Sequence, residues 1–177
     1  MNGSSELIFA LKEDIGIPEL FSGRKADLKY LMDWSERTKF QGTLSLAIFA
    51  RRKKGKTALV QRFYIILFTR NDPMIIPFYY KVKEVEKSQL QLAEEFYSSL
   101  LSQYAAFKTR DISLITQKPS YDELIELLNN DPFFIGDIKT MKRYLEECDS
   151  DQAWDFASYA GERISVQKNE RIIQILD

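Results

Sequence analysis

The feature that most constrains the fold is the stretch ARRKKGKT at residues 50–57. It follows an apolar run, LSLAIF, at residues 44–49, and it opens a segment with apolar residues at helical spacing over residues 56–69. A buried strand, a tight basic loop ending in Gly-Lys-Thr and a helix, in that order, form the context of a Walker A phosphate loop. The sequence therefore predicts a strand over 44–49, a phosphate loop over 50–57 and a helix over 56–69.

The residue types of this loop suit the binding of a polyphosphate. Backbone N–H groups of the loop and the positive end of the following helix make a cavity for phosphate. Gly55 lets the backbone approach without a Cβ, Lys56 can reach the β- and γ-phosphates, and the Thr57 hydroxyl can hold Mg²⁺. The predicted nucleotide-binding residues are Ala50, Arg51, Arg52, Lys53, Lys54, Gly55, Lys56, Thr57 and Ala58. Ala50 stands where the consensus has its first glycine.

The same basic residues allow a second interpretation. A charged loop over residues 51–56 can contact nucleic-acid phosphates, or a protein partner, without binding a nucleotide. The intact Gly-Lys-Thr between an expected buried strand and an expected buried helix favours the nucleotide site, because a generic basic turn does not need that tripeptide.

The composition excludes several other kinds of site. The chain has 177 residues, a formal net charge of −1, one cysteine and no histidine. A histidine-based catalytic triad, a histidine metal site and an intrachain disulfide are therefore impossible within it. The near-neutral charge disfavours general nucleic-acid binding. No apolar run approaches the roughly 18 residues of a membrane span, and the N-terminus lacks a signal-peptide pattern, so we expect a cytoplasmic protein without membrane contact.

The remaining patterns predict one α/β domain over residues 17–177 after a loose N-terminal lead over residues 1–16. A helix is predicted from the apolar stripe Leu28, Leu31, Met32 and Trp34. A strand is predicted over 74–82, with Pro77 placing it at a sheet edge or a bulge. Helices are predicted over 88–108, 120–128, 135–148 and 151–166, with a connector over 109–119 and a final strand over 171–177.

The final strand, RIIQILD, ends in Asp177. An apolar strand that ends in aspartate, downstream of a Walker A loop, is the Walker B pattern, whose carboxylate holds Mg²⁺ directly or through water. We therefore predict Thr57 and Asp177 as the metal-binding pair. The alternative is that Asp177 is a plain turn residue at a strand end.

Five segments together resemble the archaeal-type AAA-like ATPases of the STAND group: PELFSGRKADLKYLMDW, LAIFARRKKGKTALVQRF, MIIPFYYKV, LAEEFYSSLLSQY and ERIIQILD. The resemblance covers most of the chain, and the loop is its most specific part. It implies bound ATP and Mg²⁺ and a P-loop NTPase fold of three α/β/α layers, with an incomplete parallel sheet and an additional helical insert. It also places the LFVGRE-type box near the adenine and ribose, which assigns Phe21, Ser22, Gly23 and Arg24 to base contact. The box departs from the family at Ser22 and Lys25, and its alternative is a loop that only packs before the helix.

In that family a water-orienting glutamate usually follows the Walker B aspartate, and further strands, a sensor residue and a regulatory C-terminal region come after it. The next strand lies between the Walker A and Walker B strands, so a sheet built from the present segments lacks a central strand. We therefore expect a truncated gene product or the front portion of a larger protein. Its expected function is ATP binding with little or no hydrolysis, read out by a C-terminal region or a protein partner. A small-molecule kinase is disfavoured, because no base-like residues follow the loop at a recognisable spacing.

Overall fold

The computed structural model describes residues 7–11, 23–40, 45–49, 51, 54–82 and 86–177. These residues form a mixed α/β structure that is mostly helical and contains a small parallel sheet. The described elements are α1 (Lys25–Thr38), α2 (Lys56–Arg70), β1 (Ile75–Tyr80), α3 (Gln89–Thr109), α4 (Ser113–Gln117), α5 (Tyr121–Leu127), α6 (Pro132–Glu146), α7 (Ser150–Ser158), α8 (Ala160–Lys168) and β2 (Arg171–Leu176).

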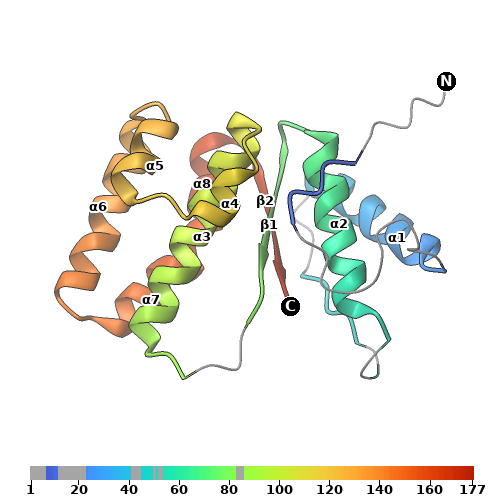
Figure 1. The fold of residues 1–177 in the computed structure, drawn as a ribbon, viewed down its shortest axis with the longest axis horizontal. Helices are drawn as coiled ribbons and strands as arrows, with labels where there is room; N and C mark the ends of the chain where they lie inside the picture. Colours follow the sequence, from blue (N-terminus) through green and yellow to red (C-terminus); the bar gives the residue numbers. More distant parts are fainter. Residues whose placement is uncertain (1–6, 12–22, 41–44, 50, 52–53, 83–85) are drawn as a thin grey trace.

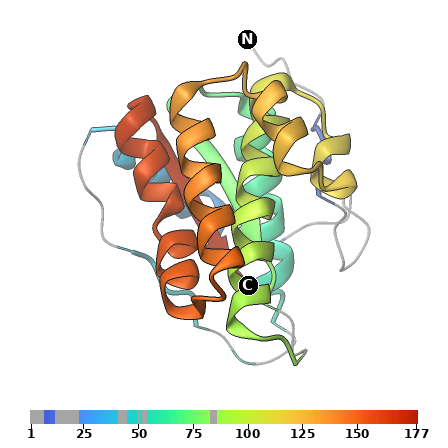
Figure 2. The same ribbon diagram turned by 90° about the vertical axis from the view of Figure 1, so that its left-hand side faces the viewer.

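Helices cover both faces of the sheet (Figure 1). Helices α1 and α2 lie on one face, with α2 packed against β1. Helices α3 and α8 pack on the other face, against β1 and β2 respectively. Figure 2 shows this second helical layer from its outer side, where α6, α7 and α8 lie beside α3. The helices α3 to α8 form the insert that separates the two strands in the chain.

Strands β1 and β2 are adjacent and parallel, although the whole helical insert lies between them in sequence. Ile75 lies opposite Arg171, and Tyr80 lies opposite Leu176. The hydrogen bond from the Arg171 amide to the Met74 carbonyl shows which residues of each strand turn their backbone groups toward the other strand. In a parallel ladder successive residues alternate their backbone groups between the two sides, so Pro77 faces away from β2 and its missing N–H removes no ladder bond. The predicted edge position of Pro77 is confirmed.

Helix boundaries follow the predicted local signals closely in three places. Helix α2 begins at Lys56, as predicted. Ser88 caps α3, and its hydroxyl accepts a hydrogen bond from the Gln91 amide at 3.2 Å. Ser120 caps α5 in the same way, accepting from the Glu123 amide while the Glu123 side chain accepts from the Ser120 amide. These capping boxes satisfy backbone donors that a helix start leaves without partners.

Two predicted helices and one predicted connector were wrong in detail. Helix α6 begins at Pro132 rather than residue 135, because Asp131 caps it and proline is favoured at the first helical position. The helix predicted over 151–166 is two helices that meet at Tyr159, whose backbone leaves the helical region (φ −88°, ψ 2°). The connector predicted over 109–119 contains the short helix α4, whose first amide is bonded by the Asp111 carboxylate.

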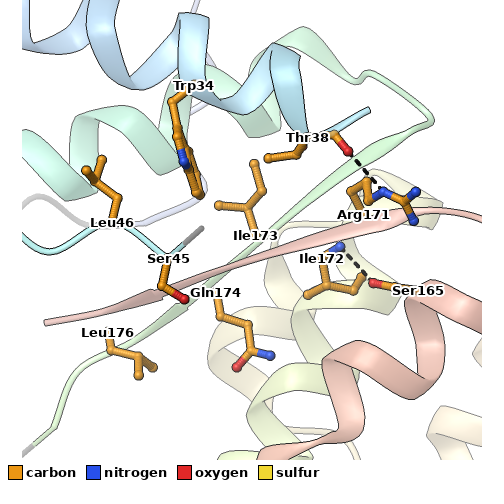
Figure 3. A pocket seen from close by; sticks show the side chains of 10 residues that line it. All are labelled: Trp34, Thr38, Ser45, Leu46, Ser165, Arg171, Ile172, Ile173, Gln174 and Leu176. Carbon is orange, nitrogen blue, oxygen red and sulfur yellow. Dashed lines mark hydrogen bonds between the residues drawn. The ribbon is translucent and has the colours of Figure 1, made fainter. Parts of the chain in front are cut away.

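The strand predicted over residues 44–49 is also wrong for the residues described. Residue 44 lies outside them, and residues 45–49 form no strand. Leu46 is 37% exposed and Phe49 is 92% exposed, whereas a Walker A strand is expected to be buried. Ser45 and Leu46 line a cavity of about 630 Å³ together with β2 (Figure 3), and within the described part of the chain they pair with no strand. An apolar run forms a strand only where a neighbouring strand pairs with it.

The core lies on both faces of the sheet, between β1 and α2 on one side and between the strands and the helical insert on the other, and it is rich in aromatic rings. Phe96 on α3 makes edge-to-face contacts with Phe78 and Tyr80 of β1 and with Trp154 of α7. Such pairs add to the burial of apolar area, which is the main stabilising term. Within the described part of the chain, no helix has both the length and the apolar character needed to cross a bilayer.

Candidate functional site

The start of α2 lies beside the C-terminal end of β2. Gly55 is the N-cap of α2 and has a left-handed backbone (φ 72°, ψ 29°), which glycine adopts without steric cost. Its carbonyl accepts the hydrogen bond from the Leu59 amide that starts the helical ladder, at 3.0 Å. In parallel α/β sheets, ligands bind outside the carboxyl ends of the strands, and the N-terminus of a helix favours an anion. The chain therefore places an anion-favouring helix end where such folds bind ligands.

Thr57 and Asp177 meet at this point. The Thr57 hydroxyl donates a hydrogen bond to Asp177 Oδ1 at 3.0 Å, across a separation of 120 residues in the sequence. The backbone of Asp177 continues the ladder, since its amide donates to the Tyr80 carbonyl and its carbonyl accepts from the Val82 amide. The position of the carboxylate is therefore set by the sheet, and the position of the hydroxyl by the first turn of α2.

A second side chain donates a hydrogen bond to the Asp177 carboxylate, and a third donates to that second side chain. The Tyr79 hydroxyl donates to Asp177 Oδ2 at 2.8 Å, and Gln61 Nε2 donates to the Tyr79 oxygen at 3.3 Å. Gln61 and Tyr79 are both buried. A hydrogen bond to a carboxylate is stronger than one between neutral groups. The bonds from Thr57 and Tyr79 therefore fix the orientation of both Asp177 carboxylate oxygens.

Lys56 also lies at this end of the sheet. With Asp177 and β2 residues it lines a cavity of about 280 Å³, whose other walls come from α1, α2 and the segment 45–49. The apolar lining includes Leu31, Val60 and Phe63. Apolar walls strengthen electrostatic interactions, so an ammonium and a carboxylate at this cavity are suited to an anionic ligand with a bound cation.

Arg24, one of the residues predicted to contact the base, lies against the loop that is predicted to bind phosphate. The Arg24 guanidinium donates to the Lys54 carbonyl and, at 3.1 Å, to the Asp27 carboxylate. Gly23 has a positive φ of 78°, which favours glycine. One residue of the predicted base-contact set therefore touches the loop predicted to bind phosphate.

Part of the predicted site lies outside the described residues, namely Phe21, Ser22, Ala50, Arg52 and Lys53. Of the described members, Arg51 and Lys54 are exposed, Gly55, Lys56 and Thr57 are partly buried, and Ala58 is buried. The structure brings together Gly55, Lys56, Thr57 and Asp177.

The donor set suits a hard cation that is shared with a phosphate ligand. A hydroxyl oxygen and a carboxylate oxygen lie 3.0 Å apart, and oxygen donors are those that Mg²⁺ prefers. Protein sites for Mg²⁺ with nucleotides commonly supply only one or two such ligands and leave the others to phosphate and water. Thr57 and Asp177 would hold the ion, which would neutralise phosphate charge beside Lys56.

Sequence reasoning missed Tyr79 and Gln61. A usable signal was present, because Tyr79 lies near the carboxyl end of its predicted strand, as Asp177 does. Parallel neighbouring strands bring such ends to the same edge of a sheet. The sequence alone did not show that these two strands are neighbours.

Comparisons with protein-family models, curated proteins and solved structures find no match.

We expect Tyr79→Phe to lower the free energy of unfolding by about 1.5 kcal/mol, because it removes a hydroxyl bonded to a carboxylate and takes a partner from Gln61. Urea unfolding followed by circular dichroism measures the change. Tyr30→Phe is the control, because Tyr30 is 53% exposed on α1, and we expect it to change stability little. Equal stability of the two variants would show that the Tyr79–Asp177 bond contributes nothing.

Proposed function

We propose that this chain is an ATP-binding P-loop domain of the three-layer α/β/α class, similar to the AAA-like ATPases of the STAND group. The observation that supports the proposal most directly is the 3.0 Å contact between Thr57 Oγ1 and Asp177 Oδ1. Thr57 belongs to the phosphate-loop pattern, and Asp177 ends an apolar strand downstream of that loop.

The bound species in this proposal is ATP with Mg²⁺. Phosphate oxygens would contact the N-terminal end of α2 and the Lys56 ammonium, while Thr57 and Asp177 hold the metal. Arg24 fixes the Lys54 carbonyl, so it would act on the shape of the loop.

We propose little or no hydrolysis by the chain in isolation. Among the described residues, Asp177 supplies the carboxylate that is hydrogen-bonded to the first turn of α2. A carboxylate engaged by Thr57 and Tyr79 is suited to holding a metal, and a separate base or water-orienting group is needed to activate water. Nucleotide binding without turnover would act by shifting a conformational equilibrium.

The decisive experiment compares ATP binding with and without Mg²⁺ for the wild type and Thr57→Val. Valine keeps the shape of threonine and removes the hydroxyl that would hold the metal. We expect Mg²⁺ to increase the affinity of the wild type for ATP. In Thr57→Val we expect this increase in affinity to be roughly tenfold smaller. Thr140→Val is the control, because it makes the same change on α6, where the hydroxyl bonds only the Gly136 carbonyl. Isothermal titration calorimetry measures both affinities.

A salt series in the same experiment separates this function from nucleic-acid binding by the basic loop. Binding to duplex DNA through several phosphates would fall linearly with the logarithm of salt concentration, with a slope of about −0.9 for each contact. We expect no saturable DNA binding at physiological salt. DNA binding with a steep slope, together with an absence of Mg²⁺-dependent ATP binding, would show that the basic loop binds nucleic acid and that the proposed nucleotide site is wrong.

A further inference from the structure

Tyr79 is held by side chains from both helical layers. Gln103 of α3 accepts from the Tyr79 amide at 2.9 Å and donates to the Tyr79 carbonyl at 2.8 Å, on the edge of β1 that faces away from β2. Gln61 of α2 donates to the Tyr79 hydroxyl oxygen at 3.3 Å. Helices α2 and α3 pack on opposite faces of β1 (Figure 1). Both the backbone and the hydroxyl of Tyr79 are therefore fixed.

The hydrogen bonds of Tyr79 are made in the interior of the protein. Tyr79, Gln61 and Gln103 are all buried, and the Tyr79 ring lies edge-on to the buried Tyr64 ring, with 6.3 Å between the ring centres. A buried hydroxyl that loses its acceptor does not find another in bulk water, so the loss costs the desolvation of that group. The bond from Tyr79 to Asp177 is therefore costly to break.

The two carboxylate oxygens of Asp177 have different partners. Oδ1 accepts from the Thr57 hydroxyl at 3.0 Å, and Oδ2 accepts from the Tyr79 hydroxyl at 2.8 Å. A hydroxyl oxygen that donates one hydrogen bond keeps two acceptor lone pairs, so Thr57 can hold a cation while it bonds Oδ1. Oδ1 is therefore the oxygen beside the proposed metal ligand, and a rotation that turned both oxygens toward one cation would break the bond to Tyr79.

We propose that Tyr79 makes this site selective for Mg²⁺ over Ca²⁺, because its hydroxyl engages the Asp177 oxygen that a second metal bond would need. The inference rests on the proposed function, in which Thr57 and Asp177 hold the cation of Mg-ATP. Mg²⁺ demands near-ideal octahedral coordination and usually keeps several waters, whereas Ca²⁺ takes more oxygen ligands and accepts both oxygens of one carboxylate. Tyr79 acts through Asp177, so it is a positioning residue.

A purely structural role for the Tyr79 hydroxyl predicts a different result. A buried tyrosine that only satisfies its own hydroxyl contributes to stability, and its loss affects the binding of Mg-ATP and Ca-ATP equally. A tyrosine that holds Oδ2 affects them unequally, because freeing that oxygen adds a ligand for Ca²⁺ and leaves the single bond to Mg²⁺ as it was. The ratio of the two dissociation constants therefore separates the two roles.

The test measures ATP binding by calorimetry in an excess of either MgCl₂ or CaCl₂, so that all the ATP carries a metal. We expect the wild type to bind Mg-ATP more tightly than Ca-ATP. In Tyr79→Phe we expect this preference to fall by about tenfold, because one hydrogen bond to a carboxylate no longer opposes Ca²⁺. Tyr104→Phe is the matched control, because it removes a hydroxyl bonded to the Glu170 carboxylate at 3.0 Å in the helical insert. We expect it to leave the preference unchanged.

A second variant, Gln61→Met, tests the same arrangement without changing Tyr79. It removes the donor to the Tyr79 oxygen, and we expect the preference for Mg²⁺ to fall by less than in Tyr79→Phe. An unchanged preference in folded Tyr79→Phe, or in Gln61→Met if Tyr79→Phe does not fold, would overturn this proposal and leave the nucleotide site standing. Equal binding of Mg-ATP and Ca-ATP by the wild type would do the same. A wild type that binds ATP with neither metal would overturn the proposed function as well.

Discussion

Replacing Lys56 by alanine should weaken the binding of Mg-ATP by about ten- to a hundredfold. The proposed ammonium–phosphate interaction is a charge-assisted hydrogen bond, worth about 1.5–3 kcal/mol, and each 1.4 kcal/mol corresponds to tenfold in affinity. Lys56 is partly buried and lines the cavity that Asp177 also lines, where the surrounding apolar walls reduce screening by water. Calorimetric titration of the folded variant with Mg-ATP gives the change in dissociation constant.

The matched control for Lys56→Ala is Lys139→Ala. Lys139 is exposed on α6, so this variant changes the net charge equally at a distance from the site. We expect it to bind Mg-ATP as the wild type does. If Lys56→Ala also binds as the wild type does, the assignment of the phosphate loop is wrong, whatever the result for Thr57→Val.

The second large effect is expected at Arg163, in the helical insert. Its guanidinium donates to Asp137 through Nε at 2.8 Å and through Nη2 at 3.0 Å. Asp137 is 6% exposed and also accepts from the Tyr97 hydroxyl at 2.8 Å. Burial, reinforced by Asp137, raises the pKa of Tyr97, so the tyrosine remains protonated as a donor.

Arg163→Met should therefore lower the free energy of unfolding by about 3 kcal/mol. Removing one partner of a buried ion pair leaves a buried charge uncompensated, which costs about 3–5 kcal/mol, and the partial exposure of Arg163 favours the lower end. Urea unfolding measures the loss. Arg143→Met, an exposed position on α6, should change stability little by comparison.

A double variant separates the loss of the ion pair from the loss of packing. In Arg163→Met with Asp137→Asn, no charge is left buried and the amide oxygen can still accept from the Tyr97 hydroxyl, so we expect recovery of much of the lost stability. A double variant as unstable as Arg163→Met would mean that the cost comes from the other contacts of Arg163, which lies over the Phe156 ring at 3.6 Å from its centre and donates to the Phe156 carbonyl at 2.6 Å.

Local signals in the sequence predicted local structure well. The capping residues Ser88 and Ser120 mark helix starts because their side chains bond backbone amides only three residues away. The apolar spacing after Gly55 predicted α2 because helix formation depends on neighbours along the chain. The contact between Thr57 and Asp177 agrees with the pairing of a Gly-Lys-Thr loop with a downstream apolar strand that ends in aspartate, and the role of the two residues in metal binding stays a prediction.

The features that failed depend on residues distant in sequence. The run at 44–49 has the composition of a strand, but strand formation needs a neighbouring backbone, and across from Ser45 and Leu46 lies a cavity. Gln61 and Tyr79 are connected to Asp177 only through the pairing of β1 with β2, which no short pattern encodes. The break at Tyr159 between α7 and α8 had no proline or glycine to mark it at that residue.

The contact between Thr57 and Asp177 has a consequence for the order in which the molecule folds. It joins residues 120 positions apart, so forming it closes a loop that contains the whole helical insert. Closing so long a loop in a disordered chain is entropically unfavourable, whereas helices that are already packed shorten the effective loop. We therefore expect the insert to collapse first and the two strands to pair late, so that the contact between Thr57 and Asp177 forms in the last stage of folding.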